Sequence, residues 1–248
     1  MHRILFHIGP FTLYTYGLFV AVAFVLGSLL ILRDSKKAGI SETAMLDCLL
    51  AILIGGIIGG RLLFVLINMG DYISDPARIL MLHEGGLAFH GSLAGGLAAG
   101  AICAKLRGIP LLKGVDVVAP YIALGQAIGR VGCFMNGCCF GKVIDHGIGV
   151  TFPGEDVMRV PVQLYSSAAL LVIFALLIAI RRGTRTRGAV FAWYLILYGI
   201  YRTMIEFLRG DNPAVFMGLD LAQLISVGMF AAGVVMWGIL NARGERRD

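Results

Sequence analysis

The chain has 248 residues, of which 58% are apolar and only 15% are charged, and its mean hydropathy is +0.85. This composition excludes an ordinary soluble domain and predicts a protein of the lipid bilayer. We attribute the net charge of +6 to basic residues that face anionic lipid headgroups, so no nucleic acid partner is expected.

Seven apolar segments are long enough to cross a bilayer. A helix needs roughly 20 residues to span about 30 Å of hydrocarbon, and in lipid its backbone groups must be paired within the segment. We therefore expect an all-α fold: a polytopic helical bundle that forms one domain over residues 1–248. In chain order, the predicted helices cover residues 13–33, 44–68, 87–105, 115–132, 164–180, 188–208 and 219–240.

The positions of the Lys and Arg residues predict the orientation of these helices. Thirteen of them follow the first, third, fifth and seventh helices, and five lie on the opposite side. By the positive-inside rule, the amino terminus is outside and the carboxyl terminus is cytoplasmic. The remaining three, Arg61, Arg130 and Arg202, fall within the predicted spans.

The first two predicted helices carry a tyrosine and an arginine near the outer face. Tyr16 lies near the outer end of the first helix, and Arg61 lies in the outer half of the second. A charge in hydrocarbon costs about 2.5–3.5 kcal/mol on insertion scales, so an intramembrane arginine is a functional-site hypothesis by default. The alternative for Arg61 is that its side chain snorkels to the interface.

Several glycines lie within the second and third predicted helices. Small residues at four-residue spacing let membrane helices approach closely, so we expect most of them to be packing contacts. Gly85 and Gly86 differ because they precede His90 at the start of the third helix, where they could let backbone amides approach a ligand. Taken alone, His90 would more often be a satisfied histidine at a helix end.

The fourth and sixth helices bring further charges to the outer side. The fourth ends near Arg130, and a long outer loop or arm follows at about 133–163; its length favours a lid or a docking element. Arg202 and Glu206 lie four residues apart in the last two turns of the sixth helix and could neutralise each other. Such a pair leaves Arg61 and Arg130 without a carboxylate, which suggests that a bound anion supplies the missing charge. A phospholipid phosphate is the nearest candidate, since a guanidinium binds it with two parallel hydrogen bonds.

Residues 129–141, with the sequence GRVGCFMNGCCFG, closely resemble the signature of bacterial prolipoprotein diacylglyceryl transferases. Segments 8–10 with 14–18, 60–61, 84–91, 161–165 and 198–211 are similar to further motifs of that family in the same order. The chain departs from the pattern at four positions. Val160, Ser166 and Ser92 replace the usual His, Glu and Gly, and Cys133 stands where several relatives have Asn.

The resemblance implies transfer of the diacylglyceryl group of phosphatidylglycerol to the lipobox cysteine of prolipoprotein signal peptides. The products are a thioether and glycerol phosphate. It further implies a multi-pass protein of the bacterial cytoplasmic (inner) membrane whose active site faces the outer leaflet. No cofactor is expected.

The same resemblance suggests roles for the polar residues. Arg130 and Arg202 would stabilise the developing phosphate charge. His90 would act as base or proton relay, because the thiol must lose a proton and has an ordinary pKa near 8.5. Tyr16 would complete the catalytic group by hydrogen bonding to glycerol or phosphate oxygens. The expected substrate-binding residues are Arg130, Arg61, Asn136, Gly141, Glu206 and Tyr198.

Two other classes of protein compete with this interpretation. Cys133, Cys138 and Cys139 suggest a membrane thiol-disulfide oxidoreductase, but they form no C-x-x-C pair. Metal binding by these thiols lacks a clear fourth ligand, so we assign no metal site. A small-solute transporter would also explain intramembrane charges, although its site would usually lie near the midplane between repeated halves.

Overall fold

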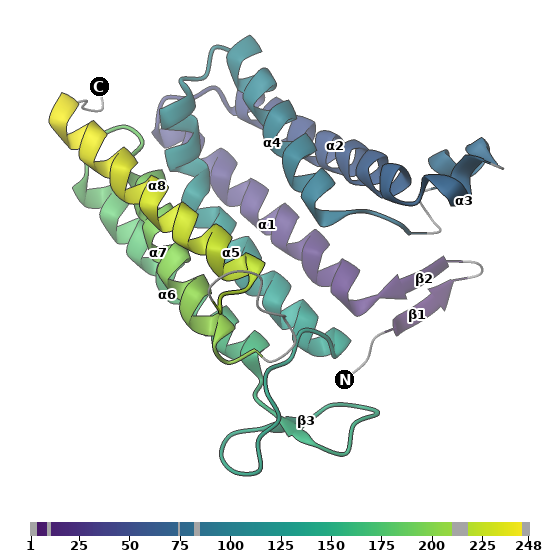
Figure 1. Cartoon of the computed structure of the whole chain (residues 1–248). Helices are drawn as coiled ribbons and strands as arrows, with labels where there is room; N and C mark the ends of the chain where they lie inside the picture. The colour runs from purple at the N-terminus through teal and green to yellow at the C-terminus, as the bar shows by residue number, and fades with distance from the viewer. Residues whose placement is uncertain (1–3, 9–10, 74, 82–84, 210–217, 245–248) are drawn as a thin grey trace. The chain divides into compact units, whose positions relative to one another are not determined.

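A computed structural model of the chain (Figure 1) describes residues 4–8, 11–73, 75–81, 85–209 and 218–244. Two short antiparallel pairs of strands accompany the helices. The elements are β1 (Ile4–Ile8), β2 (Phe11–Tyr14), α1 (Thr15–Lys37), α2 (Glu42–Ile67), α3 (Met69–Ile73), the 3-10 helix η1 (Pro76–Leu80), α4 (Phe89–Leu106), α5 (Leu111–Asn136), β3 (Val150–Thr151), β4 (Met158–Arg159), α6 (Val162–Gly183), α7 (Ala189–Glu206) and α8 (Leu221–Arg243).

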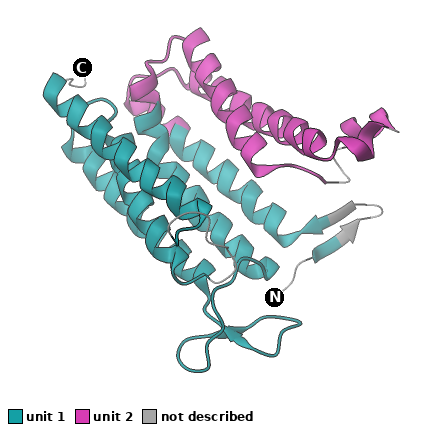
Figure 2. Ribbon diagram, in the orientation of Figure 1, with its two compact units in different colours: residues 1–31, 115–248 teal, residues 32–114 magenta. Residues whose placement is uncertain are grey.

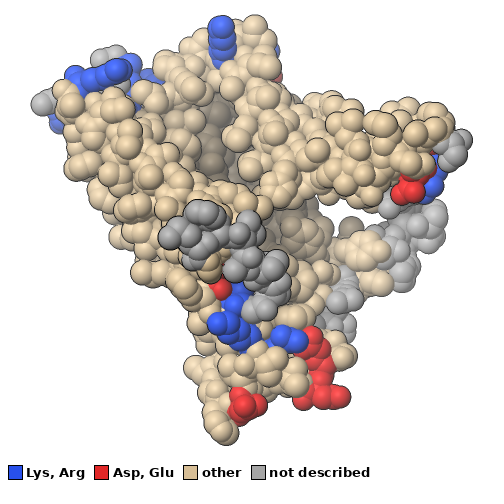
Figure 3. Space-filling view, viewed as in Figure 1, with Lys and Arg blue, Asp and Glu red and all other residues tan. Residues whose placement is uncertain are grey.

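The expected helical membrane protein is confirmed. Each of the seven predicted segments coincides with a long helix, and α1, α2, α5, α6 and α8 are long and apolar enough to cross a membrane. The other two, α4 and α7, are shorter, at 18 residues each. Large apolar side chains on these helices are exposed, including Leu97 at 65% and Leu66 at 60%, and most of the visible surface carries no charge (Figure 3). Lipid rather than water suits such a surface.

The chain divides into two compact units (Figure 2). Unit 1 comprises residues 1–31 and 115–248, and unit 2 comprises residues 32–114. Helix α1 therefore begins in unit 1 and ends in unit 2.

Unit 2 is built on close packing between α2 and α4. A β-carbon added to Gly55 would lie 2.7 Å from the carbonyl oxygen of Gly95, and one added to Gly59 would lie 2.9 Å from the Gly95 Cα and still closer to the Gly91 oxygen. The two backbones can touch only because these positions carry no side chain. The expected packing role of the glycines is confirmed here.

Polar contacts fix both ends of the α2 and α4 pair. At one end, the Ala88 amide donates to the Gly60 carbonyl at 3.0 Å, just before α4 begins. At the other end, Arg107 forms an ion pair with Asp47 at 2.6 Å. The start of α4, which carries His90, is therefore attached to α2 at Gly60, the last glycine of that helix.

The core of unit 1 lies among α5, α6 and α7. Small residues of α5 pack against larger ones, among them Ala123 against a cluster that includes Leu177 and Val190. Asp116 of α5 is buried, and its carboxylate accepts hydrogen bonds from the amides of Gly188 and Phe191 at 2.6 and 2.9 Å. A carboxylate at a helix amino terminus also complements the helix dipole, so this contact fixes the start of α7 against α5.

The connection between α5 and α6 differs in detail from the expected arm at 133–163. Helix α5 continues to Asn136, so it includes both Arg130 and Asn136. Beyond it, β3 and β4 pair with Val150 opposite Arg159, and further bridges join Gly141 to Arg209 and Val143 to Arg159. The connection is therefore partly strand, and it reaches the end of α7 through Arg209.

Replacing Gly59 by Ala should destabilise the protein, because its methyl group would push into the backbone of α4. Overpacking of this kind typically costs about 1–3 kcal/mol. Gly56 is a matched control on the same helix, since its added β-carbon would meet only the Ser92 oxygen at an ordinary 3.4 Å. Thermal unfolding in detergent should show a lowered midpoint for Gly59→Ala and an unchanged or higher one for Gly56→Ala. Equal losses in the two variants would contradict the proposed contact.

Candidate active site

Unit 1 gathers two of the intramembrane arginines. Arg130 lies in the last two turns of α5 and Arg202 in the last turn of α7, and both are half-buried. The two guanidinium groups are close enough to repel each other, and the Tyr198 phenol interacts electrostatically with both. The structure therefore brings together three of the residues that the sequence assigned to the site.

A buried carboxylate partly neutralises these cations. Glu206 is only 4% exposed and forms ion pairs with Arg202 and, at 3.6 Å, with Arg209. The local pair expected for Arg202 and Glu206 thus exists. Arg202 also interacts with Arg130 and Arg209, so three guanidinium groups share one region with the Glu206 carboxylate. Among the described residues of this region, guanidinium groups outnumber carboxylates, which suits a bound anion.

Helix α1 adds Tyr16 to this group. Its side chain is 44% exposed and interacts electrostatically with Arg130 and with the thiols of Cys133, Cys138 and Cys139. Gly132 of α5 makes this approach possible, because a β-carbon there would lie 2.8 Å from Phe19 and 3.4 Å from the Tyr16 ring. Gly132, two residues after Arg130, therefore sets the distance between α1 and α5.

The turn after α5 is held tightly in place. Gln163 is fully buried, and its side-chain amide donates to the Cys138 carbonyl at 2.7 Å. Gly141 is also buried; a β-carbon there would lie 2.7 Å from the Leu208 oxygen, and its amide donates to Val160 at 3.0 Å. Gly141 thus lets two chain segments meet, and its N–H is already used within the protein.

Cys138 lies among hydrogen-bonding and charged neighbours. Hydrogen bonds from the Cys133 and Cys139 thiols lower the pKa of Cys138, burial opposes them, and Asn136 and Arg130 lower it further. Asn136 therefore lies beside the same turn and interacts with its central thiol.

Unit 2 holds Arg61 in a different environment. The side chain is buried, 5% exposed, and its guanidinium donates five hydrogen bonds of 2.5–3.4 Å to backbone carbonyls. The cation also lies 5.4 Å from the Tyr72 ring centroid and 6.0 Å from that of Phe64. The accepting carbonyls belong to Arg78, Ile79, Met81, Gly85 and Gly86. Arg61 thus organises the chain that leads to His90.

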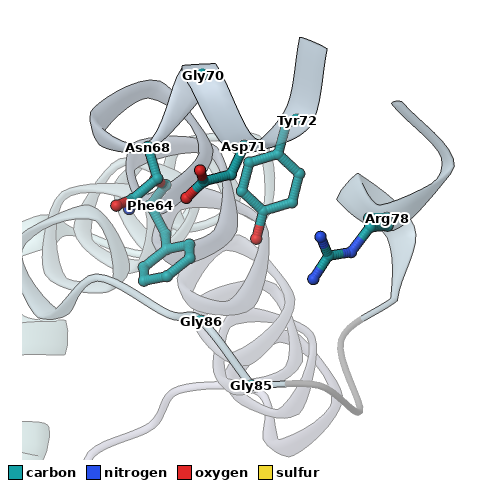
Figure 4. Close-up of a pocket in the computed structure, with 8 residues that line it drawn as sticks. All are labelled: Phe64, Asn68, Gly70, Asp71, Tyr72, Arg78, Gly85 and Gly86. Carbon is teal, nitrogen blue, oxygen red and sulfur yellow. The ribbon is translucent and has the colours of Figure 1, made fainter. Parts of the chain in front are cut away.

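A pocket of about 570 Å³ opens beside this network (Figure 4). Tyr72 and Arg78 extend toward the same space from opposite walls, and Asp71 lies on the same side as Tyr72. This pocket was not predicted from the sequence, although the polar residues just after the second span were a signal for it. Its lining consists of Phe64, Asn68, Gly70, Asp71, Tyr72, Arg78, Gly85 and Gly86.

His90 lies in the first turn of α4 and is exposed. Its ring packs edge-on against Phe89, with centroids 5.6 Å apart. His90 and Arg61 belong to unit 2, whereas Arg130, Arg202 and Tyr16 belong to unit 1. That His90 acts at one site together with Arg130 and Arg202 therefore stays a prediction.

The residues that depart from the family pattern lie within packed regions. Ser92 faces Gly60 between α2 and α4. Ser166 is buried in α6, and Val160 exchanges backbone hydrogen bonds with Gly141 and Lys142. Motif positions Gly9, Pro10, Glu84 and Asp211 lie outside the described residues.

Comparisons with known proteins agree with the motifs. The family model for prolipoprotein diacylglyceryl transferase matches residues 3–239. The chain is similar to the phosphatidylglycerol–prolipoprotein diacylglyceryl transferase of Clostridium tetani, with 32% identity over 99% of this chain and 100% of that protein. It is also similar to the enzyme of the same name from Geobacter sulfurreducens, with 34% identity over 97% of this chain and 95% of that protein.

Replacing Gly86 by Ala should disturb the Arg61 network more than the same change at Gly85. Both glycines have a left-handed backbone, with φ of +81° and +82°, so both variants carry a similar strain of roughly 1–2 kcal/mol. Only at Gly86 would the added carbon also meet Arg61 Nη1 and Phe64, at 2.7 Å. The unfolding midpoint in detergent should therefore fall further for Gly86→Ala. A smaller loss at Gly86 than at Gly85 would refute the contact.

Proposed function

The chain belongs to the prolipoprotein diacylglyceryl transferase family, and from this premise we propose how its residues carry out the reaction. The enzyme transfers the diacylglyceryl group of phosphatidylglycerol to the cysteine thiol of a prolipoprotein. The bond between the glyceryl carbon and the phosphate oxygen breaks, a carbon–sulfur bond forms, and glycerol phosphate leaves. The thiol gives up its proton in the process.

The site is proposed to face the outer leaflet of the bacterial cytoplasmic membrane. Seven crossings, with the amino terminus outside, are supported by the clustering of Lys and Arg after alternate helices. In this orientation α5 and α7 both run outward, which puts Arg130 and Arg202 at the level of outer-leaflet headgroups. Helices α4 and α7 would then be crossings despite their shorter length.

Arg130 and Arg202 are proposed to bind the phosphate of phosphatidylglycerol. The observation that carries this proposal is that the two guanidinium groups, on different helices, lie within electrostatic reach of each other and of Tyr198. Charge that develops on a leaving phosphate is stabilised most strongly by donors already in place in a site of low dielectric constant. Glu206 would orient Arg202, with which it is paired.

Tyr16 and Asn136 are proposed to hydrogen-bond the glycerol or phosphate oxygens. Tyr16 has an exposed side chain beside Arg130, and Asn136 ends the helix that carries Arg130. Gly141 is proposed to support this substrate-binding region by letting the turn pack against Leu208, since its N–H already donates to Val160.

His90 is proposed as the base or proton relay for the incoming thiol. It is exposed at the start of α4, and an imidazole titrates close to neutral pH in its ordinary state. Direct phosphate binding by Arg61 would require its five hydrogen bonds to break, so we propose that Arg61 acts by holding the loop before His90. The prolipoprotein would present its signal-peptide cysteine to this face.

The reaction is tested directly by mass spectrometry. Purified protein in detergent is incubated with phosphatidylglycerol and a lipobox peptide. The peptide should gain the mass of one diacylglyceryl group on its cysteine, and glycerol phosphate should appear in equal amount. An unmodified peptide beside folded enzyme would refute the proposed substrate pair.

Arg130→Ala and His90→Ala should each abolish most of this turnover. Loss of one preorganised donor typically lowers kcat by about 10²–10³-fold, and loss of a general base by about 10²–10⁴-fold. Arg185→Ala is the matched control, because it removes one exposed arginine after α6, away from the proposed site. Initial rates at saturating lipid separate the variants. Normal turnover in either site variant would remove that residue from the mechanism.

A further inference from the structure

Three thiols meet beside Arg130, and the transfer reaction as proposed uses none of them. The Sγ atoms of Cys133, Cys138 and Cys139 all lie within 4.8 Å of one another, and those of Cys138 and Cys139 are 3.5 Å apart. All three side chains are half-buried. They come from the last turn of α5 and from the turn that follows it.

The backbone around these cysteines is arranged to keep them together. The Cys138 amide donates to the Cys133 carbonyl at 3.2 Å, and the buried Gln163 binds the Cys138 carbonyl from α6. Cys139 has φ of +62°, in the left-handed region that residues other than glycine rarely adopt. Such a conformation persists where the surrounding structure fixes it, often at functional sites. The cluster is therefore present before any ligand arrives.

We propose that Cys133, Cys138 and Cys139 bind one soft, thiophilic metal ion, of which Cu(I) fits best. Metal–thiolate bonds of about 2.3 Å place three sulfur atoms roughly 4 Å apart around a trigonal ion. The Cys138 and Cys139 sulfur atoms are 3.5 Å apart and no pair of the three exceeds 4.8 Å, which is compatible with that value. Thiolates select soft ions such as Cu(I), whereas structural zinc sites almost always have four ligands. Three-coordinate Cu(I) matches the three thiols of the described cluster.

The surroundings suit the charge of such a centre. Bound as three thiolates, the cysteines give the Cu(I) centre two negative charges; the protons of the thiols pass to water and no electron is exchanged. The Arg130 guanidinium and the Asn136 side chain both interact with Cys138, and a cation beside an anionic centre stabilises it. Tyr16 lies within electrostatic reach of all three sulfur atoms.

Occupancy of this site should also slow the transfer reaction, a consequence that rests on the proposed function. An anionic copper–thiolate centre would compete with the lipid phosphate for Arg130. The cluster would then link enzyme activity to the supply of soft metal ions at the membrane face where Arg130 lies.

Metal binding is tested on the full-length protein in detergent, without oxygen. The protein competes for Cu(I) with a chromophoric Cu(I) chelator, and the copper removed from the chelator is counted per chain. One equivalent is expected for the wild type and none for the triple variant Cys133→Ser, Cys138→Ser, Cys139→Ser. The double variant Cys48→Ala, Cys103→Ala is the matched control, since it removes the other two cysteines and should keep the full equivalent.

Thermal unfolding of every variant establishes that a loss of copper is not a loss of fold. The site is refuted if the wild type takes no copper from the chelator, if the triple variant takes as much, or if thiol counting shows two of the three cysteines joined in a disulfide. Lipobox-peptide transfer is measured on the same samples. Unchanged turnover at full occupancy would refute the inhibition alone, and the copper count stands whether or not the peptide is modified.

Discussion

The cost of placing guanidinium groups among apolar helices governs the structure of both units. A buried cation is tolerated only where hydrogen-bond acceptors or an opposite charge accompany it. Arg61 meets this condition with five backbone carbonyls, and Arg202 meets it with the Glu206 carboxylate. The first arrangement uses every donor within the protein and makes a rigid support. In the part of the chain that the structure describes, the second shares the Glu206 carboxylate among several cations, as a site for an anionic substrate would require.

Close helix packing decides where these groups lie. Gly59 lets α2 touch α4, so that the turn carrying His90 starts directly against the Arg61 segment. Gly132 does the same for α1 and α5, and thereby brings Tyr16 to Arg130. In each unit, such a glycine lies two residues from an arginine of the proposed site: Gly59 from Arg61, and Gly132 from Arg130. The polar chemistry and the packing of the bundle therefore depend on the same short stretches of sequence.

Most of the helical architecture was predictable, because hydropathy alone sets the length of a segment in lipid. Local pairs such as Arg202 and Glu206 were also predictable, since both members lie on one helix face. The partners of Arg61 were not, because they are backbone oxygens 17 to 25 residues away that leave no side-chain pattern. The β1–β2 hairpin was missed beside the stronger apolar signal of α1. The extra turn of α5 was missed because the span was ended near Arg130, although Phe134 and Met135 beyond it are apolar.

The hydrogen bonds of Arg61 have a consequence for the divergence of this region. Every residue type has a carbonyl oxygen, so the path of the chain at residues 78–81 is fixed without any demand on the side chains there. Substitutions can accumulate along this stretch while its course stays the same, provided that Arg61 persists. A single buried cation can thus preserve the path of a loop while the side chains of that loop change, and a comparison of sequences alone would not reveal this constraint.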